Sequence, residues 1–120
     1  MKRDALRIVA AGEAGPLERL EPLARAIFGH GDRAPMWFSR KLDRECVDPG
    51  LSRLVVAGDA KDPGAWRGYA LVGTPPSSAP AVRTAGVGIV PSSRGTGLGA
   101  RLLDAVIDGC RSAGFAAVLT

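Results

Sequence analysis

The chain has 120 residues, 46% of them hydrophobic, and its 16 Lys and Arg against 12 Asp and Glu give a net charge of +4. This composition is typical of one globular domain, so it excludes a disordered chain and leaves little room for a second domain. No apolar run approaches the ~20 residues of a membrane span, and none of signal-peptide length follows the basic start, so we expect a single cytoplasmic domain over residues 1–120.

The basic excess is spread thinly along the chain, without a basic run or interleaved aromatic residues. A nucleic-acid partner is therefore the weakest of the functions considered, and no membrane partner is expected. His30 is the only histidine, and Cys46 and Cys110 lack the spacing of metal ligands. We therefore expect no metal site and two reduced, buried thiols.

The first half of the chain predicts one strand followed by two helices. Residues 6–11 have β-branched centres and predict the strand. Apolar side chains at helical spacing over residues 16–28 predict a helix that ends at Gly29, in which Pro22 either kinks the helix or marks its true first turn. Residues 34–46 predict the second helix, which the turn sequence Asp48-Pro49-Gly50 ends.

The second half predicts three strands, a helix and a last strand. The three strands are residues 53–57, 66–72 and 82–90, and their short connections indicate an antiparallel meander. Residues 98–110 have an amphipathic helical pattern and residues 115–119 form an apolar run, so they complete a parallel βαβ unit. We therefore predict an α/β fold with a mixed central sheet, antiparallel first and parallel last.

The most informative segment runs from the strand ending at Val90 into the helix beginning near Leu98. Glycines stand at every second position of the turn, at Gly95, Gly97 and Gly99. Glycine lets the backbone approach a ligand closely, and a helix start offers unpaired N–H groups and a positive dipole end. This arrangement suits a phosphate, to which Arg94 can add a charge-assisted hydrogen bond.

Two other phosphate-binding motifs fit less well. A P-loop needs a lysine after its last glycine, and no lysine occurs beyond Lys61. A dinucleotide-binding turn needs an acidic residue about 20 positions further on, where residues 115–120 have none. The glycine turn therefore favours a different phosphate ligand.

The sequence Arg94-Gly95-Thr96-Gly97-Leu98-Gly99-Ala100 resembles the acyl-coenzyme A motif of the GNAT superfamily of N-acetyltransferases. The preceding residues 87–91 resemble the fourth strand of that fold, and the order of elements resembles its first two-thirds. The resemblance implies acetyl-CoA as co-substrate, with its pyrophosphate on the amides of residues 95–100 and its pantetheine arm along the fourth strand. The implied coenzyme-binding residues are Val87, Gly88, Ile89, Arg94, Gly95, Thr96, Gly97, Leu98, Gly99 and Ala100.

The family resemblance implies an N-acetyltransferase that transfers the acetyl group to a primary amine, of a small molecule or a peptide, by direct attack. A backbone N–H of the fourth strand would polarise the thioester carbonyl. Many family members have a carboxylate base near that strand, where residues 82–87 have none. Glu45, Asp48 and Tyr69 are the remaining candidates, and no catalytic residue is assigned among them.

The chain ends at Thr120, where the family fold normally continues with a helix and a hairpin, so we expect a C-terminally incomplete GNAT fold. A second copy could complete the exposed last strand as a homodimer. The segment 29–46, including Trp37 and Phe38, is implied to line the acceptor side. The alternative function is a non-catalytic acyl-CoA-binding or regulatory module.

Overall fold

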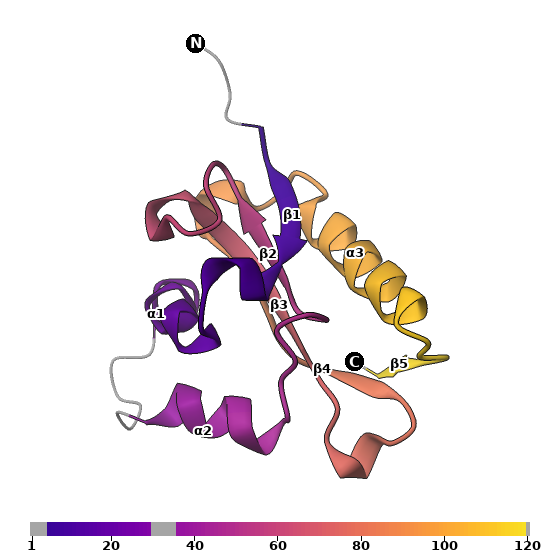
Figure 1. Ribbon diagram of the computed structural model, residues 1–120. Helices are drawn as coiled ribbons and strands as arrows, with labels where there is room; N and C mark the ends of the chain where they lie inside the picture. The colour runs from indigo at the N-terminus through magenta and orange to yellow at the C-terminus, as the bar shows by residue number, and fades with distance from the viewer. Residues whose placement is uncertain (1–4, 30–35, 120) are drawn as a thin grey trace.

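The computed structural model describes residues 5–29 and 36–119, and its centre is a five-stranded sheet in the order β1-β2-β3-β4-β5 (Figure 1). The first four strands pair antiparallel with their neighbours, and β5 pairs parallel with β4. This confirms the predicted mixed sheet. The strands are β1 (Arg7–Ala10), β2 (Arg53–Val56), β3 (Trp66–Gly73), β4 (Val82–Ile89) and β5 (Val118–Leu119).

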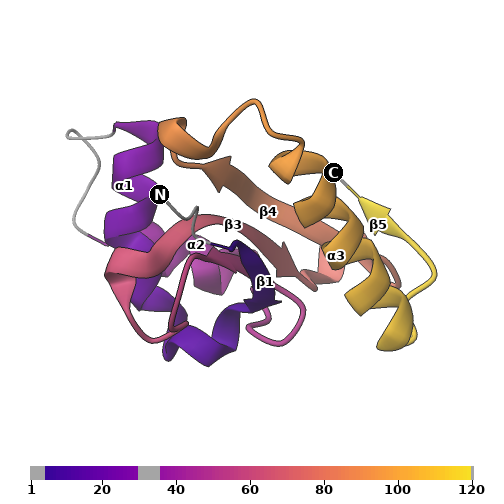
Figure 2. The same cartoon turned by 90° about the horizontal axis from the view of Figure 1, so that it is seen from above.

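Helices cover both faces of this sheet and make two separate cores (Figure 2). Helices α1 (Glu21–Phe28) and α2 (Trp37–Arg44) lie on one face, where Leu20, Phe38 and Tyr69 belong to the first core cluster. Helix α3 (Leu98–Ser112) lies on the other face, where Leu102 and Val106 belong to the second. In both cores, the helices contribute side chains that repeat every 3.6 residues and the strands contribute side chains that repeat every 2 residues.

Helix α1 begins later than the apolar pattern suggests. A short 3₁₀ helix, Leu17–Leu20, precedes it, and Pro22 lies in the first turn of α1. The second of the two alternatives for Pro22 is therefore confirmed, because a proline in the first turn removes only an N–H that has no helical partner. The helix ends at Gly29 with φ 64°, a left-handed conformation that glycine adopts without a steric penalty.

Three expectations need correction or fall outside the described residues. The predicted strand over residues 115–119 is paired only at Val118–Leu119, because Phe115 still donates its N–H to Cys110 O at 3.0 Å and closes the end of α3. Cys110 is buried as expected, whereas Cys46 is exposed, because it follows α2 in a surface turn with φ 50°. His30 and the first residues of the predicted second helix lie outside the described ranges.

Within residues 5–29 and 36–119, none of the helices has the length and apolar character that crossing a membrane requires.

Candidate functional site

Strand β4 has a neighbour on both sides only at its beginning. Val82 and Arg83 pair with β5, whereas β3 continues along β4 to Ile89. The register between β3 and β4 shifts after Leu71, because Leu71 is opposite Gly86 but Val72 is opposite Thr84. Ala85 is thus the extra residue of a β-bulge, a feature that bends a strand and ends pairing. Within residues 5–29 and 36–119, no strand pairs from residue 84 onward with the side of β4 that faces away from β3, and we call this side the open edge.

The hydrogen-bond pattern shows which backbone groups point out of this open edge. Val90 donates its N–H to Arg67 O at 2.9 Å, so these two residues form a hydrogen-bonded pair. Such pairs alternate along an antiparallel ladder. In the register of β3 and β4, Gly88 therefore directs its N–H and C=O toward β3, whereas Val87 and Ile89 direct theirs outward. The open edge thus presents the N–H of Val87 and the C=O of Ile89.

The glycine turn follows β4 and joins it to α3. After the 3₁₀ turn Pro91–Ser93, Gly95 and Gly97 have φ values of 79° and 76°, and a Cβ at either position would meet nothing within 4 Å. In the described part of the chain, none of the N–H groups of residues 95–100 donates a hydrogen bond. These amides lie at the positive end of the 15-residue helix α3. The turn is therefore a backbone cradle for an anion.

Arg94 links the cradle to the open edge. Its Nε donates to Ile89 O at 3.0 Å, which agrees with the outward direction of that carbonyl. The side chain is exposed, and its two terminal nitrogens make no hydrogen bond among the described residues. The guanidinium therefore presents two further donors beside the glycine turn, a geometry that suits phosphate oxygens.

The ten residues predicted for coenzyme binding form one continuous surface from the end of β4 to the first turn of α3. Two of them have a different part in it from the one expected. Gly88 directs its backbone toward β3, and a Cβ there would lie 2.8 Å from Ile27 Cγ2, so it makes room for α1. Leu98 is buried in the core beneath α3, so its side chain is not part of the surface of the turn.

Two further side chains approach the open edge from the face of the sheet that α1 and α2 cover. A Cβ at Gly86 would lie 3.7 Å from Lys41 Nζ and 3.9 Å from Tyr69 Cε2, and Gly86 has φ 150°. Lys41 comes from α2 and Tyr69 from β3, so these residues meet only in the folded chain. From the sequence alone, Lys41 is most simply interpreted as part of a solvated face of the helix predicted over residues 34–46. The alternation Gly86-Val87-Gly88 within a strand was the available signal, because glycine in a strand often marks a bulge or a close approach.

The three candidate bases differ in their position. Glu45 and Asp48 lie at the other end of β3: Val47 forms a bridge with Gly73, and Asp48 Oδ1 accepts hydrogen bonds from the N–H groups of Gly50 and Leu51. Gly73 is opposite Arg83, and Val87 lies four residues further along β4, about 13 Å at a rise of about 3.3 Å per residue. Neither carboxylate therefore lies at the open edge.

Tyr69 does lie beside the open edge, in a dry environment. Its side chain is almost fully buried, and burial raises the pKa of its phenol to about 12. The phenol is thus neutral at physiological pH, and it can donate a hydrogen bond but cannot act as a base.

Of the two aromatic residues expected on the acceptor side, Phe38 is a core residue, and Trp37 packs edge-on against it at a centroid distance of 5.5 Å. Phe38 is therefore part of the core and does not line the acceptor side.

Within the described ranges, no group of three or more His, Cys, Asp and Glu side chains could hold a metal ion. The residues fit a phosphate-bearing thioester better than a metal, because their chemistry is that of backbone donors and one guanidinium. A Cβ added at Gly95 or Gly97 would meet no other atom within 4 Å, so no side chain fills the cradle at these positions.

Comparisons with known proteins identify the family and the fold. The sequence model of the acetyltransferase (GNAT) family matches residues 17–120. No curated protein sequence matches the chain. Among solved structures, a proposed N-acetyltransferase from Lactobacillus plantarum is similar at 22% identity with a TM-score of 0.64, over 92% of this chain and 70% of that one.

Two structures with bound ligands are also similar. A GNAT family acetyltransferase from Brucella melitensis in complex with acetyl-CoA has 15% identity and a TM-score of 0.60, over 97% of this chain and 75% of that one. The N-acetylglutamate synthase from Neisseria gonorrhoeae, complexed with coenzyme A and N-acetyl-glutamate, has 20% identity and a TM-score of 0.52. That match covers 98% of this chain and 25% of the synthase, so this chain spans only a quarter of that relative's length.

Proposed function

Since this chain belongs to the GNAT family of acetyltransferases, we propose that it transfers the acetyl group of acetyl-CoA to a primary amine by direct attack. The observation that carries the proposal is the continuity between the six unpaired amides of residues 95–100 and the open edge of β4. A ligand with a pyrophosphate at one end and an amide-containing arm at the other needs both of these surfaces at once.

The backbone of this chain would do most of the work. The amides of residues 95–100 and the terminal nitrogens of Arg94 would hold the pyrophosphate oxygens. The outward groups of Val87 and Ile89 would pair with the pantetheine amides as an added strand, because an open sheet edge binds extended amides through its backbone. This places the thioester along β4 without any charged side chain.

Acetyl-CoA supplies a thioester whose C–S bond breaks as the amine nitrogen forms a C–N bond to the acetyl carbon. The sulfur leaves as the thiol of coenzyme A, which in the net reaction takes up the proton that the attacking nitrogen loses. The Val87 N–H would stabilise the charge that develops on the carbonyl oxygen, as an oxyanion-hole donor does. The neutral phenol of Tyr69 lies beside the same stretch of β4 and is available as a further donor. The chain's contribution is therefore chiefly positioning and the removal of water from the reacting groups.

The acceptor amine would approach from the face covered by α1 and α2. Gly86 carries no side chain there, and Lys41 and Tyr69 lie near the position that its Cβ would take, whereas Ile27 and Phe28 already fill the space beside Gly88. A small-molecule or peptide amine fits this description. Pairing of β5 with a second copy of the chain stays a prediction.

A direct test is to measure the release of free thiol from acetyl-CoA with a panel of primary amines and short peptides. Thiol release that depends on the amine, together with the acetylated amine in the mass spectrum, supports the enzyme. Binding of acetyl-CoA without turnover of any amine would favour the alternative, a non-catalytic acyl-CoA-binding module. No binding of acetyl-CoA would contradict both functions.

A further inference from the structure

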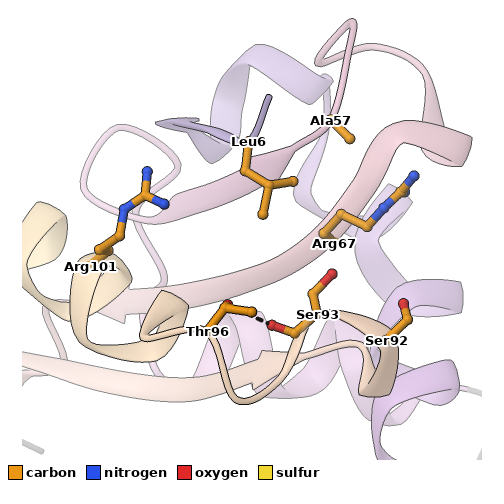
Figure 3. A pocket seen from close by; sticks show the side chains of 7 residues that line it. All are labelled: Leu6, Ala57, Arg67, Ser92, Ser93, Thr96 and Arg101. Atoms are coloured by element: carbon orange, nitrogen blue, oxygen red, sulfur yellow. Dashed lines mark hydrogen bonds between the residues drawn. The ribbon is translucent and has the colours of Figure 1, made fainter. Parts of the chain in front are cut away.

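A separate pocket lies on the other side of the turn that precedes α3, toward β1 (Figure 3). Its volume is about 500 Å³, and it is lined by Leu6, Ala57, Arg67, Ser92, Ser93, Thr96 and Arg101. None of these residues except Thr96 is among those expected to bind the coenzyme. Figure 3 shows that they surround one space and come from the residue before β1, the residue after β2, the start of β3, the turn and α3. The pocket thus collects five segments that are far apart in the sequence.

Two arginines from different elements give the pocket its charge. Arg101 makes no side-chain hydrogen bond or ion pair within the described residues. Arg67 uses only its Nη1, which donates to Gly64 O at 2.8 Å and Trp66 O at 3.1 Å. Its Nε and Nη2 therefore keep their donor capacity. Among the described residues that line the pocket, none is acidic, so none of them offsets the charge of the two arginines.

Hydroxyl groups complete the polar wall of the pocket. Thr96 Oγ1 donates to Ser93 O at 3.1 Å, which ties the turn back on itself. The Val90 N–H bond to Arg67 O at 2.9 Å joins the start of this turn to the strand that carries Arg67. These two bonds hold the backbone of the two serines beside the backbone of Arg67.

We propose that this pocket binds a phosphate monoester. Two guanidinium groups supply planar pairs of N–H donors that match phosphate oxygens. The hydroxyls of Ser92 and Ser93 can donate to the remaining oxygens, and Leu6 and Ala57 offer an apolar surface to the group that carries the phosphate. A carboxylate has only two oxygens to share among these donors, and a doubly charged phosphate monoester uses both arginines.

The phosphate monoester could come from two sources with the same chemistry. One is the 3′-phosphate of the coenzyme, a source that rests on the proposed function. The other is a separate phosphorylated metabolite that regulates or accompanies the reaction. The pocket and the glycine turn share Thr96, so either ligand would be in contact with the segment that holds the cradle.

The test compares acetyl-CoA with 3′-dephospho-acetyl-CoA by calorimetry on the unaltered chain and on the variants Arg67→Gln and Arg101→Gln. Arg111→Gln is the matched control, because it removes the same charge from the same helix ten residues further along, about 15 Å away. In parallel, inorganic phosphate is titrated by NMR against each variant, with the amides of Ser93 and Thr96 as reporters.

If the source is the coenzyme, Arg101→Gln weakens the binding of acetyl-CoA by roughly tenfold and leaves that of 3′-dephospho-acetyl-CoA unchanged. If the source is a separate metabolite, both coenzymes bind all variants equally, and inorganic phosphate shifts the two reporter amides in the unaltered chain but not in the Arg67 and Arg101 variants. The proposal is overturned if neither variant changes either response relative to Arg111→Gln. Failure of the unaltered chain to bind any acetyl-CoA would count against the proposed function alone, because the phosphate titration still tests the pocket.

Discussion

The two ends of β4 differ in how many of their backbone groups are satisfied by the protein. At the closed end, Val82 and Arg83 have strands on both sides, and β3 is in turn pressed against the turn after α2 at Gly73. At the open end, Val87 and Ile89 have a strand on one side only. A single bulge at Ala85 lies between the two ends and bends the strand there.

Glycines at the two ends have opposite physical roles. Gly73 lies where a side chain would collide with backbone, whereas Gly95 and Gly97 lie where a side chain would have space but the backbone conformation resists it. Substitutions at the closed end should therefore affect folding, and those at the turn should affect the ligand. The variants below test this separation.

The largest effect is expected for Gly73→Ala. A Cβ there would lie 2.0 Å from Glu45 O and 3.0 Å from Glu45 C, and backbone atoms cannot move aside as a side chain can. We expect a loss of about 3 kcal/mol or more in the free energy of unfolding, measured by urea denaturation. Gly58→Ala is the control, because its Cβ would meet only Ala65 Cβ at 3.4 Å. Equal stability of the two variants would show that the closed end is not tightly packed.

Gly97→Val should abolish the binding of acetyl-CoA and have a smaller effect on folding. The valine would strain a backbone with φ 76° and would project into the space where the pyrophosphate is expected. Gly114→Val is the matched control, because Gly114 also has a positive φ, 95°, and open space around it, but lies at the other end of α3. We expect both variants to lose a similar amount of stability, of order 1–3 kcal/mol, and only Gly97→Val to lose binding in calorimetry. Loss of binding in both would mean that strain alone explains the effect.

Arg94→Ala should weaken the binding of acetyl-CoA by about 1–3 kcal/mol. The variant removes both the bond from Nε to Ile89 O and the two terminal donors. Arg94→Lys retains the charge but not the planar pair of donors, so its affinity should lie between the two. If Arg94→Ala binds acetyl-CoA as tightly as the unaltered chain does, Arg94 is only a link between the turn and β4.

The smallest effect concerns Tyr69, whose burial raises its pKa from 10.0 to about 12. The unfolded chain loses the phenol proton at a lower pH than the folded chain does, so above pH 10 the unfolded state binds fewer protons. The contribution of Tyr69 to the free energy of unfolding is fully present below about pH 10 and is lost as the pH rises to about 12. Tyr69→Phe should remove this part of the decline, as followed by chemical denaturation at several pH values. A decline of the same size in the phenylalanine variant would assign it to other groups.

The sequence predicts those parts of the fold that depend on local pattern. The apolar periodicity over residues 98–110 and the glycines before it predict α3 and its cradle, because neighbouring residues determine both. Pairing across the sheet is not local. The bulge at Ala85, the shortness of β5 and the bond from Arg94 to Ile89 each depend on residues that are brought together only by folding.

The same reason explains why the sequence does not show which side chains lie together. Tyr69 is a candidate base from the sequence, but it approaches Gly86 together with Lys41 only across the sheet, and Arg67 and Arg101 share a pocket although they are on β3 and α3. Glu45 and Asp48 were plausible bases by residue type, but their place beside Gly73 puts them at the closed end. The kind of chemistry that a residue can do could be predicted from its type, but which residues lie close together could not.

The most direct test of the account is an NMR titration of acetyl-CoA that follows individual backbone amides. The account predicts chemical-shift changes and slower hydrogen exchange for the amides of Val87, Ile89 and residues 95–100, which have no partner on the open edge and in the cradle. The amides of Val82 and Arg83, at the closed end, should stay unchanged. Saturable binding that shifts the closed end, or that leaves Val87 and residues 95–100 unperturbed, would contradict the assignment of the open edge of β4 as the coenzyme site.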